Sequence, residues 1–503
     1  MISTPALTPR RAVAAATGVA MVSCLAALGS QPLSWDEAVT ANAAERTPGA
    51  LWWLLSHTDA PLGAYYLFMN GWVRALHLLG VAPSDGWLRL PSALAAVGSV
   101  ALTAALATHW LGPRAGLVAG TLLAVHPLFV FYAHDARPYT FATLFILAST
   151  IALVRALDRP NASRLCSYAA AAIMAIYAHL FACLVLAAQA IAIARNRAHR
   201  WRFAWVGLAV GLAAVPLVWI GSRETNEVGW IPRPSAATVA SFAARVGGGA
   251  MLVPMLCLVA LAAVPAIRRF RDRSGDTPVR TLAVPLLLAG WALLPPLGLI
   301  LASFLKQPII VARYALVAVP AQLITATAAA RRIGRRGAAV LATAFLTAAF
   351  LAAAVTSAVQ QAKPFKYEDF RSAAYSVADT AQSGDGLVFV PAAFRVGFDR
   401  YLRTGHGDPG RSPVADVALQ SEQSVHTSEV IGGQECDEAL LPGRIVAHDR
   451  IYLVGDTLSE ALDRRGGPTE LAKERVLRDS YSAVWSRRFG VVTVTLFVRQ
   501  RPG

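Results

Sequence analysis

Charged residues are scarce in this sequence of 503 residues. Asp, Glu, Lys and Arg make up 15% of the chain and hydrophobic residues 55%, whereas soluble domains carry roughly 25% charged residues. The mean hydropathy is +0.48. This composition excludes a soluble enzyme, a disordered chain and a small disulfide-bonded scaffold.

Cysteine pairs and nucleotide-binding motifs are also lacking. None of the five cysteines is spaced as C-x-x-C, and four of them lie in apolar runs, where cysteine behaves as a small hydrophobe. Only Cys436 lies in the polar C-terminal part, so no disulfide is expected there. That part also has no GxGxxG, P-loop or GxSxG motif. A zinc or redox centre is not expected.

The net charge of +16 is a possible sign of a nucleic-acid partner, but its distribution argues against one. Residues 1–360 carry a net charge of +17, whereas residues 361–503 carry 18 basic and 19 acidic residues, a net charge of −1. The excess lies in the apolar part, where it reports membrane topology.

Apolar stretches of about 17–25 residues are long enough to cross a bilayer as helices. The sequence predicts eleven spans, at about 12–30, 87–110, 115–131, 138–157, 166–178, 180–195, 203–221, 246–267, 281–304, 309–330 and 338–360. We interpret the first as a signal anchor, because no small-residue cleavage site follows it.

Arginine is concentrated in alternate loops, at residues 10–11, 114, 159–164, 195–202, 268–280 and 331–336. By the positive-inside rule these loops and the N-terminus face the cytoplasm, and eleven spans then place the tail outside. Most acids before residue 361 fall on the opposite side: Asp36, Glu37, Glu45, Asp59, Asp85, Asp135, Glu224 and Glu227. Either acids avoid the cytoplasmic loops, a weak bias, or this face carries chemistry.

The expected architecture is therefore an α-helical polytopic membrane protein of the plasma membrane. Residues 1–360 form the transmembrane domain, with a long first outer loop over 31–86 that contains short interfacial helices near 38–46 and 49–55. Residues 361–503 form a small extracytoplasmic α/β domain. In it, a helix over 366–381, strands in 387–391, 444–455 and 489–500, and helices near 458–465 and 469–477 are predicted.

The acidic pair Asp36 and Glu37 directly follows the first span. An acidic pair at a membrane surface is costly unless it is used, satisfied or solvated. Asp36 is a candidate general base that removes a proton from an acceptor hydroxyl. The alternative is structural, with Ser34 or Asp36 capping the helix that follows.

The segment 57–66 contains His57 and Asp59. Asp59 is a candidate ligand of a divalent metal or a group that polarises a donor. The alternative is a capped turn in which Asp59 precedes a helix with Pro61 at its first position.

Three further groups lie at the same predicted face. Asp135, Arg137 and Tyr139 follow one another within five residues, and an arginine there can bind phosphate oxygens in a bidentate manner. A structural Asp135–Arg137 pair is the alternative. His179 lies between the fifth and sixth spans and is either structural or part of the site.

The last group is Lys306, Arg313 and Tyr314. Lys306 is the only lysine before residue 361, and Arg313 lies just inside an apolar segment, where it needs an anionic partner. Snorkelling to the lipid headgroups is the alternative. The candidate groups thus place acids, arginines and tyrosines from distant segments at one membrane face. A transfer reaction from a lipid-phosphate donor requires such a set of side chains.

The chain resembles the GT-C superfamily of polytopic glycosyltransferases, and within it family 39-like enzymes, similar to protein mannosyltransferases and lipid A aminoarabinose transferases. The motifs that carry the resemblance are SWDEAVTANAA, HTDAPLGAYYL, RLPSALAAVGSV, YAHDARPYTFATL, YAHLFACLVLAAQ and ARYALVAVPA. The segment YEDFRSAAYSVADTAQSGDGLVFV is similar to the extracytoplasmic domain of actinobacterial members.

The resemblance implies a polyprenyl-phosphate sugar donor and transfer on the extracytoplasmic side to a glycan, lipid or protein acceptor. It implies that Asp36, with Glu37 beside it, is catalytic and that Asp59 is a metal or phosphate-side residue. Related enzymes often carry a lysine after this acid, where this chain has Ala60. A flippase for a lipid-linked glycan, or a non-catalytic scaffold, are the alternative functions. No inverted repeat of the kind transporters show is present.

Overall fold

The computed structural model describes residues 7–57, 59–194, 200–221, 231, 233–257, 279–331, 336–405, 414–420, 433–455 and 467–500. The chain divides into two compact units. The helical unit comprises residues 1–28, 59–65 and 89–362, and the mixed unit comprises residues 29–58, 66–88 and 363–503. Most of the first outer loop, which the sequence analysis assigns to the transmembrane domain, thus belongs with the tail.

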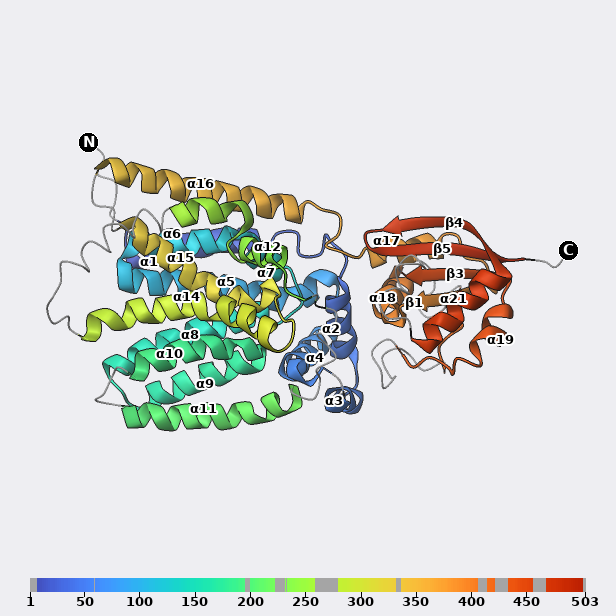
Figure 1. Cartoon of the computed structure of the whole chain (residues 1–503), viewed down its shortest axis with the longest axis horizontal. Coiled ribbons are helices and arrows are strands. Elements are labelled where there is room, and N and C mark those ends of the chain that lie inside the picture. Colours follow the sequence, from blue (N-terminus) through green and yellow to red (C-terminus); the bar gives the residue numbers. More distant parts are fainter. Residues whose placement is uncertain are drawn as a thin grey trace. The chain divides into compact units, whose positions relative to one another are not determined.

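Long apolar helices build the helical unit (Figure 1). They are α1 (Pro9–Leu25), α5 (Asp85–Leu111), α6 (Pro113–Val125), α7 (Pro127–Ala133), α8 (Tyr139–Asp158), α9 (Ala162–Ala178), α10 (Cys183–Ala194), α11 (Arg200–Gly221), α12 (Ala236–Val246), α14 (Val279–Leu305), α15 (Val319–Arg331) and α16 (Arg336–Gln361). Short 3₁₀ helices span Ala60–Leu62, Leu180–Ala182, Gly249–Met251 and Ala312–Ala318. Helix α1 packs on α6, α8 on α9, α10 on α14, and α9 on α11.

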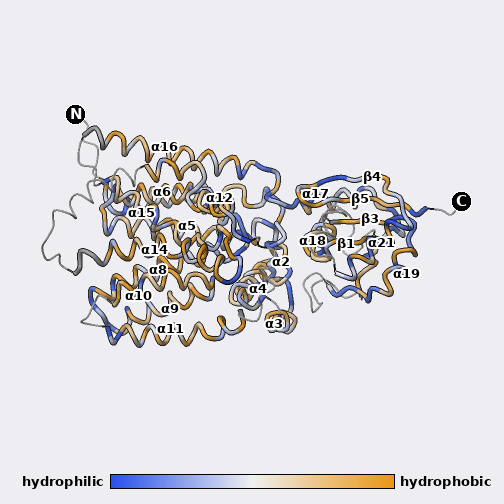
Figure 2. Tube along the Cα trace, viewed as in Figure 1, coloured by the Kyte–Doolittle hydropathy of each residue, from blue (hydrophilic) through white to orange (hydrophobic). Residues whose placement is uncertain are grey.

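Five of the described helices are long and apolar enough to cross a membrane: α5, α8, and residues 200–220, 284–305 and 340–361 of α11, α14 and α16. The number rises to seven if each of two bent helix pairs is one span, and shorter apolar helices cover Ala162–Ala178 and Leu180–Ala194. Figure 2 shows hydrophobic residues along these helices. Each of the eleven predicted spans contains helix, but their number stays a prediction.

Two predicted spans are not straight. The helices of the first pair, α6 and α7, meet at 63° where Pro127 interrupts the helix expected over 115–131, because proline has no N–H for the helical hydrogen bond. In the second pair, α12 and Gly249–Cys257 meet at 85°. Residues 258–267 of that predicted span lie outside the described residues.

Small residues bring α1, α5 and α6 close together. A Cβ atom on Gly120 of α6 would lie 2.7 Å from Cβ of Ala16 and 2.9 Å from Cβ of Ala104. A Cβ atom on Gly116, one turn earlier, would overlap the Thr108 hydroxyl and lie 2.6 Å from the Ala104 carbonyl oxygen. This G-x-x-x-G spacing lets helix backbones approach closely in an apolar medium.

A five-stranded sheet forms the centre of the mixed unit, in the order β2-β1-β3-β5-β4. Its strands are β1 (Gly386–Val390), β2 (Ala415–Asp416), β3 (Arg450–Gly455), β4 (Tyr481–Phe489) and β5 (Val492–Arg499). Strand β1 is parallel to β2 and β3, whereas β5 is antiparallel to β3 and β4. Between them lie α17 (Phe370–Ala378), α18 (Arg395–Gly405), α19 (Leu441–Val446), α21 (Pro468–Ser480) and a 3₁₀ turn at Ala392–Phe394.

Helices cover both faces of the sheet. Leu387 and Phe389 of β1 pack with α17 and α18, whereas Val388 and Val390 pack with α19 and α21. This alternation follows from the two-residue period of a strand. Strand β3 begins at Arg450 rather than in the expected segment from 444, because residues up to Val446 belong to α19. The helix predicted near 458–465 lies outside the described residues.

The outer-loop helices are α2 (Trp35–Glu45), α3 (Pro48–His57) and α4 (Gly63–Leu78). Helices α2 and α3 lie near the short helices predicted at 38–46 and 49–55. Within the mixed unit, ion pairs join this loop to the tail. Asp85 accepts hydrogen bonds from Arg371 and from the Tyr401 hydroxyl, both at 2.7 Å. Glu45 pairs with Arg400 at 3.0 Å. Two of the eight outer-face acids therefore have a structural role.

We expect Gly120→Ala to destabilise the helical unit by about 1–3 kcal/mol, because the added methyl overpacks the junction of α1, α5 and α6. Thermal unfolding of the purified protein in detergent measures this loss. Gly18→Ala is the matched control, since nothing lies within 4 Å of its added Cβ. Equal unfolding temperatures for the two variants would contradict the close packing.

Candidate active site

Two guanidinium groups, an imidazole and two phenol rings meet in the helical unit. We call this set the arginine–aromatic cluster, and its members are Arg137, Tyr139, His179, Arg313 and Tyr314. The His179 ring lies 5.4 Å from the Tyr139 ring and 5.0 Å from the Tyr314 ring. The Arg313 guanidinium lies 5.8 and 5.5 Å from the same two rings. All five residues are predicted site residues, and the structure brings them together.

Each member of the cluster sits at a break in an apolar helix. Tyr139 is the first residue of α8, and His179 separates α9 from the 3₁₀ helix Leu180–Ala182. Arg313 and Tyr314 lie in the 3₁₀ helix Ala312–Ala318, which begins the segment expected as a span over 309–330. Helix ends leave backbone groups and side chains available for a ligand.

The cluster concentrates positive charge. Arg137 is 5% exposed, and both Arg137 and Arg313 interact electrostatically with His179. Two guanidiniums close to one imidazole repel each other in apolar surroundings, and an anion offsets that repulsion. Guanidinium donors match the oxygen geometry of a phosphate, and they stack on aromatic rings.

Hydrogen bonds from Ser92 of α5 hold the turn that carries Arg137. The Ser92 hydroxyl donates to the Arg137 carbonyl at 3.0 Å and lies 3.3 Å from the Tyr65 hydroxyl, while Thr140 donates to the Ser92 carbonyl at 2.9 Å. Asp135, 4% exposed, lies in the same turn, and its carbonyl accepts the Arg137 N–H at 2.7 Å. Two side chains, those of Ser92 and Thr140, and the backbone bond to Asp135 thus fix the turn around Arg137.

His134 in the same turn is structural. Its Nδ1 lies 3.0 Å from the Val130 carbonyl and its Nε2 lies 2.9 Å from the Ala26 carbonyl. The imidazole therefore ties the end of α7 to the residue that follows α1.

Asp59 lies in a turn with left-handed backbone. Its φ is +59°, a conformation that asparagine and aspartate adopt more readily than other non-glycine residues. Its carbonyl accepts the Leu62 N–H at 2.9 Å, closing the 3₁₀ turn Ala60–Leu62 before α4. His57 ends α3, and its side chain lies outside the described residues.

The donor set does not fit a metal centre. Within the described ranges, no three His, Cys, Asp or Glu side chains lie together as an ion would require. The assignment of Asp59 to a metal therefore gains no support. Lys306 directly follows α14 and has an exposed side chain, so it is not among the buried residues of the cluster.

The acidic pair lies in the first turn of α2, in the mixed unit. Ser34 is the N-cap, and its N–H and hydroxyl donate to Glu37 Oε2 at 3.0 and 3.1 Å. The same oxygen accepts Lys366 Nζ at 3.0 Å, and the Glu37 side chain is fully buried. Glu37 thus serves the capping box and an ion pair, whereas Asp36 is half-buried.

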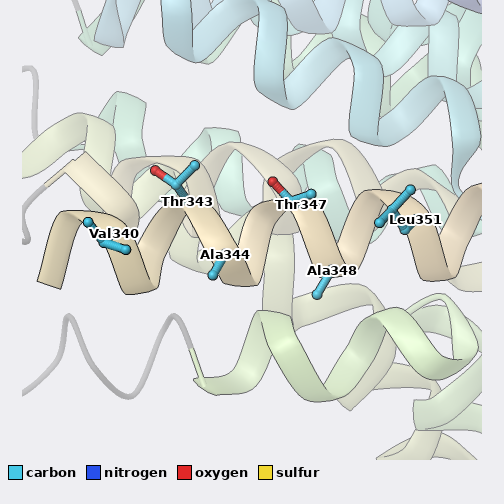
Figure 3. Close-up of a pocket in the computed structure, with 6 residues that line it drawn as sticks. All are labelled: Val340, Thr343, Ala344, Thr347, Ala348 and Leu351. Carbon is cyan, nitrogen blue, oxygen red and sulfur yellow. The ribbon is translucent and has the colours of Figure 1, made fainter. Parts of the chain in front are cut away.

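A shallow, open hollow of about 700 Å³ lies along α16 (Figure 3) and contains none of the candidate residues. Its lining is Val340, Thr343, Ala344, Thr347, Ala348 and Leu351. Apart from two threonine hydroxyls this surface is apolar, so it offers no group that would take part in chemistry.

Comparison with known proteins supports the fold. Residues 59–220 match the family model described as dolichyl-phosphate-mannose-protein mannosyltransferase. ArnT from Cupriavidus metallidurans in the apo state is similar at 15% identity and a TM-score of 0.56, over 96% of this chain and 97% of that one. The structure of ArnT from the same organism bound to undecaprenyl phosphate is similar at 14% identity and a TM-score of 0.52, again over 96% of this chain and 97% of that one. This chain has the GT-C fold.

A third GT-C structure extends the comparison to archaea. The oligosaccharyltransferase AglB from Archaeoglobus fulgidus, in complex with an inhibitory peptide and a dolichol-phosphate, is similar at 10% identity and a TM-score of 0.55. The similarity covers 98% of this chain and 74% of that chain. A search among curated proteins finds no match. The resemblance to the GT-C superfamily, to protein mannosyltransferases and to aminoarabinose transferases is confirmed.

Lys366 and Glu368 are not among the residues predicted for the site. The sequence predicts one amphipathic helix over 366–381, but α17 begins at Phe370, because the Asp369 side chain caps it by accepting the Ser372 N–H at 3.0 Å. Lys366 and Glu368 therefore lie in the irregular segment before α17, which contacts α2. Glu368 lies within the tail segment that carries the resemblance and Lys366 directly precedes it, but no sequence pattern indicates their contact with α2.

We expect Ser92→Ala to destabilise the protein by about 1–3 kcal/mol, because it removes the donor to the buried Arg137 carbonyl. Ser99→Ala is the matched control on the same helix, since Ser99 is equally buried and bonds only to its own helix at Ala95. Thermal unfolding compares the two variants. An equal loss would show that Ser92 has no special role in holding the turn.

Proposed function

We propose that this protein is an integral-membrane glycosyltransferase that moves a sugar from a polyprenyl-phosphate donor to a cell-envelope acceptor. The observation that carries the proposal is the arginine–aromatic cluster. Its two guanidiniums and aromatic rings suit a lipid phosphate, and solved structures of the same fold contain undecaprenyl phosphate or dolichol-phosphate.

In the proposed reaction Asp36 is the general base. The acceptor hydroxyl oxygen attacks the anomeric carbon of the donor sugar, and Asp36 takes the proton of that hydroxyl. The bond between the anomeric carbon and the phosphate oxygen breaks, and its electron pair stays on the polyprenyl phosphate. Arg137 and Arg313 stabilise the charge of this leaving group.

The contacts of Glu37 support the choice of Asp36. Glu37 binds Ser34 and Lys366 through one buried oxygen, so it acts as an anchor for the helix turn. Asp36 follows Trp35 in the same turn and is less buried than Glu37. We assign Glu37 to the support of Asp36 and keep Asp59, His57 and Lys306 as candidate donor- or acceptor-binding residues.

The positive-inside pattern supports transfer on the extracytoplasmic face of the plasma membrane, with the N-terminus in the cytoplasm and the tail outside. The acceptor is a glycan, a lipid or a protein of the envelope. A flippase or a scaffold has no specific support among the described residues, whereas a clustered pair of arginines suits a reaction at a phosphate.

We expect Asp36→Asn to lower turnover by about 100-fold or more, since loss of a general base costs that much, while binding of the donor lipid stays intact. The assay uses purified protein with undecaprenyl-phosphate mannose and undecaprenyl-phosphate arabinose as donors. Asp158→Asn, at the exposed end of α8, is the control and keeps wild-type turnover. Wild-type turnover by Asp36→Asn would remove Asp36 as the base.

We expect Arg313→Ala to weaken the binding of undecaprenyl phosphate by about 10- to 100-fold, the cost of a charge-assisted contact. Arg313→Lys restores only part of the affinity, because an ammonium lacks the planar fork and stacks less well on the Tyr139 and Tyr314 rings. Arg114→Ala, with an exposed side chain after α5, is the control. An unchanged Kd for Arg313→Ala would place the phosphate elsewhere.

A further inference from the structure

The segment that opens the tail holds the first turn of α2. Glu368 Oε2 accepts the backbone N–H of Trp35 at 3.4 Å, and Lys366 Nζ binds Glu37 Oε2 at 3.0 Å. Asp36 is the residue between these two attachment points. All of these residues belong to the mixed unit.

The Trp35 side chain strengthens this attachment. Its indole Nε1 donates to the Ala393 carbonyl at 3.0 Å, and its ring packs against the core formed by α17, α18 and the sheet. The backbone and the side chain of the residue before Asp36 are therefore both fixed by the tail.

The segment itself is anchored to the hairpin of β4 and β5. Asp369 N–H donates to the Phe489 carbonyl at 3.3 Å, and Val491 N–H donates to the Tyr367 carbonyl at 3.1 Å. Gly490 at the hairpin has φ +67°, and a Cβ there would lie 2.2 Å from the Tyr367 carbonyl oxygen. The hairpin of β4 and β5 thus holds Glu368 in its position next to α2.

Three carboxyl groups and one ammonium gather at this turn. Asp36 and Glu37 face Glu368 from α2, and Lys366, on the segment that carries Glu368, is bound to Glu37. Burial, together with repulsion from Asp36 and Glu37, raises the pKa of Glu368 to about 7, against the lowering effect of the hydrogen bond from the Trp35 N–H. Glu368 therefore gains and loses its charge near neutral pH.

We propose that Glu368 is a positioning residue that holds the first turn of α2, sets the basicity of Asp36 and so couples transfer to pH. This inference rests on the proposed function and extends it to the tail. An ionised Glu368 accepts the Trp35 N–H strongly and, by repulsion, makes Asp36 a stronger base. A protonated Glu368 accepts the Trp35 N–H less strongly and no longer repels the Asp36 carboxylate. The rate of sugar transfer therefore decreases as pH falls through the neutral range.

The test compares full-length wild type with Glu368→Gln, Glu368→Asp and the exposed control Glu438→Gln. Turnover of undecaprenyl-phosphate mannose and undecaprenyl-phosphate arabinose is measured on both sides of neutral pH. Wild type and control gain activity as pH rises, with a midpoint near 7. Glu368→Gln keeps an amide that accepts the N–H but shows a roughly 10- to 100-fold lower kcat at unchanged KM and loses this pH step. Glu368→Asp recovers part of the wild-type kcat and part of the pH step. A wild-type kcat and pH profile for Glu368→Gln would overturn the inference.

Infrared difference spectroscopy of the same proteins separates this inference from the proposed function. A carboxyl band that titrates near pH 7 in wild type, and is missing from Glu368→Gln but retained in Glu438→Gln, supports the inference. The absence of that band from an active wild type overturns the inference and leaves the proposed function standing. A wild type that shows the band but converts neither donor contradicts the proposed function, while the charge change at Glu368 stands.

Discussion

The interaction on which the account depends is the approach of two guanidiniums, Arg137 and Arg313, to the imidazole of His179. Cations are costly in apolar surroundings, so their retention there needs compensation from rings, backbone groups and an anion. Tyr139 and Tyr314 supply rings at the same point. A phosphate on a lipid that lies in the bilayer is an anion able to reach such a cluster, which is why the proposed function begins with it.

Several of the acids at the predicted outer face have a structural role. Their concentration at one predicted face suggests chemistry, but three of them are engaged in holding the mixed unit together. Glu45 and Asp85 pair with arginines of the tail, and Glu37 caps α2 and binds Lys366. Most of the outer loop and the tail therefore form one compact unit, and Asp36 is the acid of this unit that we propose for catalysis.

Patterns with a strong local signal could be predicted from the sequence. Long apolar runs locate α5, α8 and α14, and shorter apolar runs locate β1, β3 and β5, because both faces of these strands are largely buried. Strand β4 is mostly exposed and β2 has two residues, so neither carries such a pattern. The cluster residues could be named but not their contacts, since these join segments far apart in the chain. Lys366 and Glu368 could not be found, because their role depends on tertiary contact with α2.

The most direct test of the central claim is mass spectrometry of envelope glycans and polyprenyl-phosphate lipids from cells with and without this protein. The account predicts that loss of the protein removes one sugar from an envelope product and leaves its polyprenyl-phosphate donor to accumulate. Identical glycans and identical lipids in the two strains would contradict it.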